Sequence, residues 1–360
     1  MASQPPSPVF VPDTARINRG IAQFVRELRK DFADESSYAQ DALEGYLAVL
    51  ERGGKRLRGA LTLCGYELYG GTDMHMATKV AGIVETLHAY LLVIDDVADN
   101  ADTRRGGPSA HIHIETGLRK TPASHDIQRK SMDLAIMTAL YVQHKAQSAL
   151  CTLPVTSERK LEALGRMNEY LARTGIGQML DLISATKVPM PEEDILKIAR
   201  YKTAYYTFLL PLEIGAILAG APEKELKLIR SYALFAGVAF QLRDDILGVF
   251  GDEKSMGKSA KSDIMEGKQT LLIYYALEGG TKDERALILE SLGNERLTNK
   301  AFKGCKDVMI RTAALRKVED LATDYVDRAH EIMDNCPKRW PPEYVQYLRD
   351  IASFGAVRIH

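Results

Sequence analysis

The stretch KVAGIVETLHAYLLVIDD, residues 79–96, decides the fold class of this 360-residue chain. Its apolar residues recur at three- and four-residue intervals, the period of an α-helix, and it runs directly into an acidic pair. The stretches 195–220 and 226–250 repeat the pattern, and the second of them also contains an acidic pair. Sustained alternation of apolar and polar residues, which would indicate strands, is absent. The sequence therefore predicts an all-α protein.

Several of these stretches are apolar on nearly every side, which is typical of helices at the centre of a large bundle. Functional side chains on them would point into an interior cavity. Helices should break at Gly-Gly pairs and at Pro residues. These positions are 70–71, 121–122, 153–154, 188–191, 221–222, 279–280 and 336–337. None has the character of a domain linker, so we expect one large domain over residues 15–360.

Composition limits the classes of function. Lys and Arg number 47 and Asp and Glu 48, so no overall field marks a nucleic-acid or membrane-surface binder. The cysteines form no C-x-x-C pair, which argues against a zinc site and a disulfide framework, and a reducing cytoplasm is the simplest setting. Residues 1–14 have no signal-peptide pattern and are expected to be a flexible tail. No apolar stretch reaches the roughly 20 residues of a membrane span.

The first acidic motif is DDVAD, in which Asp95, Asp96 and Asp99 share one helix face through i to i+3 and i to i+4 spacing. Three carboxylates so close repel one another unless a cation lies among them, and clustered oxygen ligands suit Mg²⁺. The alternative is a solvated acidic helix end. The apolar run before the motif argues against it, because one turn would lie in the core and the next in bulk water.

The second acidic motif, QLRDD, places Gln241 three and four residues before Asp244 and Asp245, on one helix face. A metal is again the natural partner. A third carboxylate is missing, because position 248 is Gly248. The alternative is a surface acidic pair balanced by Arg243.

Basic clusters that could hold phosphate charge occur in four places. They are GGKRLR at 53–58, RRGG at 104–107, KT at 202–203, and Gly-Lys pairs at 257–258 and 267–268. A solvated basic loop explains any one of them, but their combination favours phosphate binding. His88 lies two helical turns before Asp95 and could donate to a phosphate, or it could be an ordinary core histidine.

From about Glu44 to Thr270 these motifs resemble, in order and spacing, the trans-type isoprenyl diphosphate synthases, the family of farnesyl and geranylgeranyl diphosphate synthases. The resemblance implies a single all-α bundle of the isoprenoid synthase type around a central cavity, usually a homodimer. Its substrates would be isopentenyl diphosphate and an allylic diphosphate, with Mg²⁺ as cofactor, three ions in each site.

The resemblance also implies roles for individual residues. Metal ligands would be Asp95, Asp96, Asp99, Asp244 and Asp245. Isopentenyl diphosphate would be held by Lys55, Arg58, His88 and Arg105. The allylic diphosphate would contact Arg104, Lys202, Lys258 and Lys268. Lys202, Thr203 and Gln241 are the catalytic candidates, because Thr203 and Gln241 would line the place where positive charge develops.

Two positions depart from the family pattern. Ile94 precedes the first Asp pair where many relatives have His, and Gly248 replaces the last Asp of the second motif. We expect the first change to be mild. We expect the second to be tolerated, because the leading aspartates of that motif carry most of the metal binding in the family.

Product length depends on the residue five positions before the first motif, which forms the cavity floor in the family. Here it is Tyr90, a large residue that should stop growth early and favours a C20 product, with C15 as the alternative. On a helical wheel Leu91 is better aligned with Asp95. A class I terpene cyclase would not need GGKRLR or Arg105, and a non-catalytic partner subunit would be expected to have lost motif residues.

Overall fold

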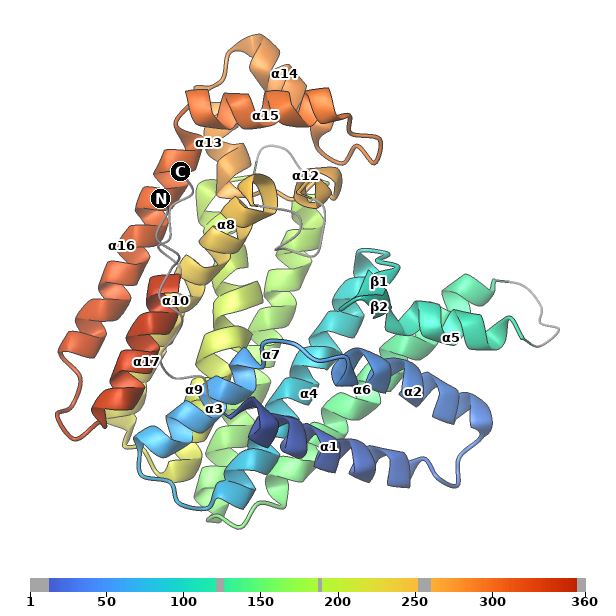
Figure 1. The fold of residues 1–360 in the computed structure, drawn as a ribbon, viewed down its shortest axis with the longest axis vertical. Coiled ribbons are helices and arrows are strands. Elements are labelled where there is room, and N and C mark those ends of the chain that lie inside the picture. Colours follow the sequence, from blue (N-terminus) through green and yellow to red (C-terminus); the bar gives the residue numbers. More distant parts are fainter. Residues whose placement is uncertain (1–12, 121–125, 187–189, 252–259, 355–360) are drawn as a thin grey trace. The chain divides into compact units, whose positions relative to one another are not determined.

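The computed structural model describes residues 13–120, 126–186, 190–251 and 260–354, and regular structure in these ranges is almost entirely helical (Figure 1). The strands in the described ranges are β1 (Thr103–Arg104) and β2 (Gly107–Pro108), which pair antiparallel. The all-α prediction is therefore confirmed.

The chain packs as two compact units, and each is treated by itself. The N-terminal unit contains Val11–Met167 and Pro211–Pro222. The C-terminal unit contains Asn168–Leu210 and the chain from Glu223 onward. Of its boundaries, the Gly/Pro positions include only the one at Pro222, because the other two fall inside helices.

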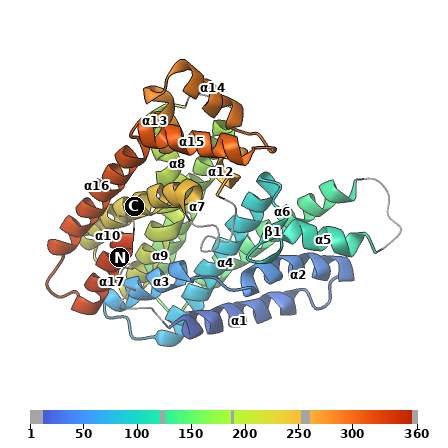
Figure 2. The same cartoon turned by 45° about the horizontal axis from the view of Figure 1, so that its top comes forward.

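The N-terminal unit is built around one long helix, α4, which packs against α1, α3 and α6. The helices of this unit are α1 (Thr14–Asp31), α2 (Ser37–Glu51), α3 (Leu57–Leu68), α4 (Met74–Ala98), α5 (Ala110–Leu118) and α6 (Ile127–Cys151). It also holds the first part of α7 (Ser157–Ser184) and most of α9 (Leu210–Ala219). Figure 2 shows these helices from a second direction.

The beginning of α1 falls within the expected tail. Residues 1–12 of that tail lie outside the described residues. Asp13 caps α1 by accepting a hydrogen bond from the Arg16 N–H at 3.1 Å, and the helix begins at Thr14. Such a cap satisfies one of the free amides of the first turn.

Helices α1 and α4 contact each other closely at two glycines, one on each helix. A Cβ at Gly20 would lie 2.1 Å from the Thr78 carbonyl oxygen, and a Cβ at Gly82 would lie 2.3 Å from the carbonyl carbon of Gly20. Any side chain at either position would push the two helices apart. This contact fixes the helix that carries the first acidic motif.

By length and composition alone, α4 could cross a membrane, and it is the one described helix that passes this test. Most of its apolar window is buried inside the protein, as in a core helix. It also carries the buried carboxylate of Glu85. The length and composition of α4 are therefore weak evidence for a membrane span.

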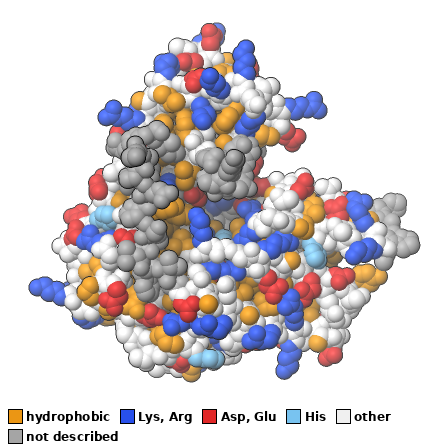
Figure 3. All heavy atoms as spheres, viewed as in Figure 1, with side chains coloured by type: hydrophobic (Ala, Val, Ile, Leu, Met, Phe, Trp, Pro, Cys, Tyr) orange, Lys and Arg blue, Asp and Glu red, His pale blue; other side chains and the backbone are white. Residues whose placement is uncertain are grey.

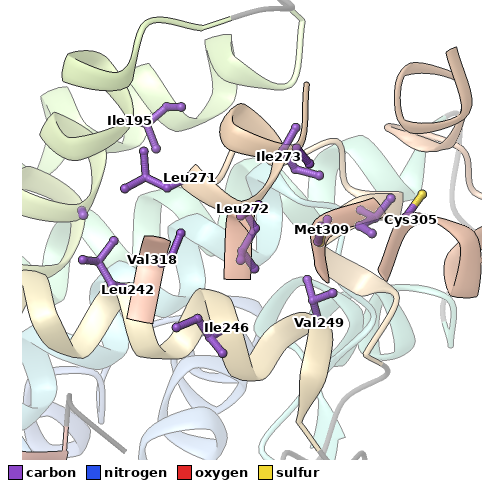
Figure 4. Packing of buried hydrophobic residues seen from close by; sticks show 14 of the residues in the cluster. Ile195, Leu242, Ile246, Val249, Leu271, Leu272, Ile273, Cys305, Met309 and Val318 are labelled. Atoms are coloured by element: carbon purple, nitrogen blue, oxygen red, sulfur yellow. The ribbon is translucent and has the colours of Figure 1, made fainter. Parts of the chain in front are cut away.

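The C-terminal unit is centred on α10, which packs against η1 and α16. Beside the second part of α7, its helices are α8 (Glu192–Ile198), the π-helix η1 (Ala199–Leu209), α10 (Glu223–Phe250), α12 (Ser262–Met265), α13 (Leu271–Gly279), α14 (Lys282–Ser291), α15 (Asn299–Arg311), α16 (Ala314–Asp334) and α17 (Pro342–Ser353). Figure 4 shows its core, in which α10 contributes Leu242, Ile246 and Val249.

Several helices end where Gly and Pro predicted a break. α3, α6, α13 and α16 each end at or shortly before an expected break. The stretch 195–220 differs, because it is divided into α8, η1 and α9 rather than forming one α-helix.

On the face seen in Figure 3, basic and acidic side chains are interspersed, as the formal charge of -1 suggests.

Candidate active site

The first acidic motif ends α4. Asp95 and Asp96 lie in its last turn, and Asp99 terminates the helix with its N–H donating to the Asp95 carbonyl at 2.8 Å. Arg104 of β1 lies against the motif. Its Nε donates to Oδ1 of Asp96 at 2.7 Å, and its Nη2 lies 3.6 Å from Oδ2 of Asp95. The chain thus supplies one cation to its own first acidic motif.

Asp96 fits a metal ligand. Its side chain is fully buried, and its Oδ2 has no hydrogen-bond partner among the described residues. Burial raises the pKa of Asp96, and the hydrogen bond from Arg104 offsets only part of this effect. Across the described ranges, no three carboxylate, imidazole or thiol groups already form a metal cluster. The motif therefore offers oxygen ligands to Mg²⁺ without being a preformed cage.

The RRGG motif is a hairpin turn between β1 and β2. Arg105 and Gly106 both have positive φ, 53° and 72°, as a two-residue type I′ turn requires. Arg52, the C-cap residue of α2, holds the hairpin by donating to the carbonyls of Arg104 at 3.0 Å and Pro108 at 2.6 Å. The turn sends Arg104 toward the aspartates, while Arg105 donates to the Val49 carbonyl at 3.1 Å.

The GGKRLR segment leads into α3 and lies beside Arg105. Gly53 and Gly54 have φ of 94° and 141°, and a Cβ at Gly54 would be 3.3 Å from the Arg105 guanidinium. Lys55 is exposed and Arg58 is half-buried. The structure thus brings three of the predicted isopentenyl diphosphate ligands into one neighbourhood. Arg56, the middle cation, is buried instead.

His88, Tyr90 and Leu91 lie on α4 one to two turns before the acidic pair. Burial of the His88 ring, together with the charges of Arg58 and Arg105, holds its pKa well below 6.5. A neutral imidazole at this position can donate through one nitrogen and accept through the other. Tyr90 and Leu91 both keep part of their surface exposed, so either can meet a ligand.

In the C-terminal unit two catalytic candidates, Thr203 and Gln241, form a hydrogen-bonded chain with Asp245. The Thr203 hydroxyl donates to Oε1 of Gln241, and Nε2 of Gln241 donates to Oδ1 of Asp245 at 2.7 Å. Thr203 lies on η1 and the other two residues on α10. The π-helix is the local feature that presents Lys202 and Thr203 side by side, and such segments are frequent at functional sites.

Lys202 has a partner that sequence reasoning missed. Its ammonium lies 2.5 Å from Oδ2 of Asp181 on α7. Gly177, one turn earlier on α7, permits this approach, because a Cβ there would lie 2.4 Å from the backbone nitrogen of Lys202. The available signal was an acidic residue within an otherwise apolar helix end.

The second acidic motif has more carboxylates around it than its sequence suggested. Burial raises the pKa of Asp245 to about 8, and the nearby carboxylates of Asp263, Asp244 and Asp181 add to the effect. Asp263, on α12, occupies the space beside Gly248, where a Cβ would be 2.0 Å from its Oδ2. A carboxylate from another element thus fills the place left by the missing third aspartate.

The two Gly-Lys pairs differ in what the structure describes. Lys258 lies outside the described residues. Lys268 forms ion pairs with Glu266 and, at 3.9 Å, with Asp263. Sequence reasoning missed Asp263 because it is fifteen positions from Gly248 and belongs to a different helix.

Comparison with known proteins gives consistent matches. The sequence model of the polyprenyl synthetase family matches residues 40–309. A geranylgeranyl diphosphate synthase of Saccharolobus solfataricus is 31% identical over 296 residues, which cover 82% of this chain and 83% of that protein. A geranylfarnesyl diphosphate synthase of Aeropyrum pernix is 30% identical over 309 residues, covering 84% and 91%.

A solved structure matches the fold. The geranylgeranyl pyrophosphate synthase of Corynebacterium glutamicum, in complex with isoprenyl diphosphate and magnesium, superposes with a TM-score of 0.85. The two chains are 26% identical, and the match covers 94% of this chain and 97% of the other. Divalent metal is therefore found with an isoprenyl diphosphate in a relative of the same fold.

Proposed function

Because this chain belongs to the polyprenyl synthetase family and is a short-chain prenyltransferase, we propose that it condenses isopentenyl diphosphate with an allylic diphosphate to give geranylgeranyl diphosphate. The observation that carries the proposal is the supply of cations for two diphosphates. One group, Lys55, Arg58 and Arg105, gathers in the N-terminal unit, and Lys202 and Lys268 belong to the C-terminal unit.

Mg²⁺ is the proposed cofactor, with three ions held by Asp95, Asp96 and Asp99 and by Asp244 and Asp245. When bound, it would withdraw charge from the departing diphosphate. The buried, unpartnered oxygen of Asp96 and the crowded carboxylates around Asp245 support this choice.

In the proposed reaction, the allylic carbon–oxygen bond breaks and diphosphate leaves with the electron pair. The isopentenyl double bond forms the new carbon–carbon bond, and a proton is lost to the released diphosphate. Lys202 and the basic clusters would neutralise the leaving group. The hydroxyl of Thr203 and the amide oxygen of Gln241 would face the positive carbon, and their hydrogen bond fixes both groups.

The test is product analysis. Purified protein with Mg²⁺, dimethylallyl diphosphate and labelled isopentenyl diphosphate should give a labelled C20 diphosphate. Conversion of the allylic diphosphate to hydrocarbon or alcohol without label would contradict prenyl transfer. A labelled product that stops at C15 would contradict the C20 assignment alone.

Tyr90 carries the C20 part of the proposal. Replacing Tyr90 by Ala should lengthen the product, because the partly exposed ring would no longer end the cavity. Leu91→Ala is the matched comparison on the neighbouring side chain. A longer product from the Leu91 variant and not from the Tyr90 variant would assign the floor to Leu91.

We also propose a cytoplasmic homodimer. On α7, Ile176, Met179, Leu182 and Ile183 are exposed apolar residues at helical spacing, and Met179 is 57% exposed. A second copy of the chain would bury this face, since exposed apolar patches of this kind mark protein contacts. Met179→Asp should convert a dimer to a monomer in size-exclusion chromatography with light scattering, and a wild-type monomer would contradict the proposal.

A further inference from the structure

Glu85 is a buried carboxylate for which the proposed reaction has no use. It lies in the middle of α4 with 2% of its surface exposed, among apolar neighbours. A carboxylate in such a place is unfavourable unless it is paired and hydrogen-bonded. Two partners meet it here. Its Oε2 lies 3.6 Å from Nη1 of Arg56, and its Oε1 accepts from the Gly59 N–H at 2.8 Å.

Arg56 is held away from the other cations of GGKRLR. Its Nε donates to Oδ1 of Asn18 at 3.0 Å, and its Nη2 donates to the Leu50 carbonyl at 3.2 Å. Its backbone has φ 53° and ψ 31°, a left-handed conformation that is unusual outside glycine. Side-chain contacts that persist with an unfavourable backbone indicate that the surrounding structure imposes the conformation.

The first turn of α3 lacks the usual local cap. Arg56 is the N-cap residue, and its side chain accepts no amide hydrogen bond. Glu85 takes this function from α4, because Gly59 is the third residue of α3 and its N–H is one that an N-cap side chain normally satisfies. The negative charge also suits the positive end of the helix dipole.

Gly59 makes room for this contact. A Cβ at this position would lie 3.2 Å from Cγ of Glu85 and 2.7 Å from Cγ2 of Ile17. The glycine therefore lets α3 approach α4 closely enough for the carboxylate to reach the helix start. Arg58 is the residue immediately before Gly59, and Lys55 immediately precedes Arg56.

Glu85 is also a negative charge among arginines. Burial lowers the pKa of Arg105 to about 10, and the charges of Arg56, Arg58 and Arg104 add to the decrease. Glu85 acts in the opposite direction and favours the protonated guanidinium. Removing its charge would therefore remove an attraction that opposes the repulsion among these arginines.

We propose that Glu85 is a positioning residue for the isopentenyl diphosphate site: by pairing with Arg56 and capping α3, it fixes the directions of Lys55 and Arg58. The inference rests on the proposed function. Arg56 then acts as a structural anchor, and the diphosphate is left to its two sequence neighbours and Arg105.

The test is Glu85→Gln, which keeps an acceptor for the Gly59 N–H and removes the charge. The KM for isopentenyl diphosphate should rise about tenfold, and the KM for the allylic diphosphate should stay within about twofold, because the Lys202 site belongs to other residues. The melting temperature should fall by about 6 °C or more. Glu67→Gln is the control, since it breaks the Arg16–Glu67 pair in the same unit. It should leave both KM values unchanged.

A double-mutant cycle with Arg56→Gln separates positioning from general stability. In the double variant, the increases in the KM for isopentenyl diphosphate that the two single changes cause should not multiply. The increase should fall short of their product by about fivefold or more, because both changes break the same Glu85–Arg56 contact. Glu85→Gln/Arg56→Gln leaves no unpaired buried charge, so it remains measurable if the single variant fails to fold. In that case its KM for isopentenyl diphosphate should still rise selectively, by about threefold or more.

Equal increases of both KM values, or no increase in a folded variant, would overturn the positioning role. A double variant whose KM increase equals the product of the two single increases would overturn it as well. Wild-type protein that incorporates no isopentenyl diphosphate would instead refute the proposed function. Normal wild-type turnover with an unchanged Glu85→Gln variant would refute only this inference.

Discussion

In the N-terminal unit the first acidic motif forms ion pairs with an arginine of the same unit, whereas in the C-terminal unit the second acidic motif is surrounded by further acidic residues. Arg104 bonds the buried carboxylate of Asp96. Asp245 has the amide of Gln241 as its donor, while the lysines nearby pair with Asp181 and Asp263. The difference teaches that the chain itself supplies a cation to the first motif through the hairpin, whereas the charge balance of the second motif depends, we propose, more strongly on bound Mg²⁺.

The largest expected effect comes from removing the hairpin cation. Arg104→Gln should lower the free energy of unfolding by about 2 kcal/mol without metal, because Asp96 stays buried without its charged donor. Mg²⁺ with inorganic diphosphate should restore much of the loss. Calorimetric unfolding with chelator and with Mg²⁺ measures both quantities.

Arg119→Gln is the control for this prediction. Arg119 forms an exposed pair with Glu115 on α5, and its loss should change the free energy of unfolding by less than about 0.5 kcal/mol. If Arg104→Gln were as stable as this control, the first motif would not depend on the hairpin for its charge balance.

The second motif can be tested through Gly248. Glycine to alanine in a helix usually stabilises by about 0.5–1 kcal/mol, but at this position the new Cβ would meet Oδ2 of Asp263 at 2.0 Å. Because the Asp263 carboxylate must turn away to admit this Cβ, Gly248→Ala should lose the usual stabilisation of about 0.5–1 kcal/mol. Urea unfolding of the variant measures whether the free energy of unfolding rises or falls relative to the wild type.

Gly165→Ala on α7 provides the matched control, since nothing lies within 4 Å of its added Cβ. Gly165→Ala should raise the free energy of unfolding by about 0.5–1 kcal/mol, the usual gain when a helical glycine is replaced by alanine. Stabilisation by Gly248→Ala as well would mean that Asp263 does not occupy the place of the missing carboxylate.

A smaller effect concerns pH. His88 has a folded pKa well below 6.5, so the unfolded chain binds a proton that the folded chain does not, and stability falls as pH decreases below about 6.5. This single group contributes a slope of at most about 1.4 kcal/mol per pH unit. His88→Gln should reduce the slope of stability between pH 6.5 and 5. The exposed His144→Gln on α6 is the control, and an equal change in both variants would contradict burial as the cause.

Local patterns predicted the local features well. The apolar period of residues 79–96 predicted helix α4, and the structure has the first motif in and directly after its last turn. Gly and Pro predicted several helix ends, including those of α3, α6, α13 and α16, because those residues act through their own backbone. The fold class and family followed from these local signals.

The features that the sequence did not predict depend on contacts between distant parts of the chain. Nothing near Lys202 in sequence indicated a π-helix, and its partner Asp181 is 21 positions away. Arg56 looked like one more phosphate ligand, since its partner Glu85 lies on another helix. The substitute for the absent acid at Gly248 was hidden for the same reason.

The most direct test of the account is a single-turnover measurement of label transfer from isopentenyl diphosphate to an allylic diphosphate in wild type, Asp96→Asn and Asp244→Asn. We expect the wild type to form a C20 diphosphate, and both folded variants to lose at least about a thousandfold in rate, because in the proposed function each motif supplies metal ligands to the same step. Wild-type rates in either variant, or consumption of the allylic diphosphate without label transfer in the wild type, would contradict it.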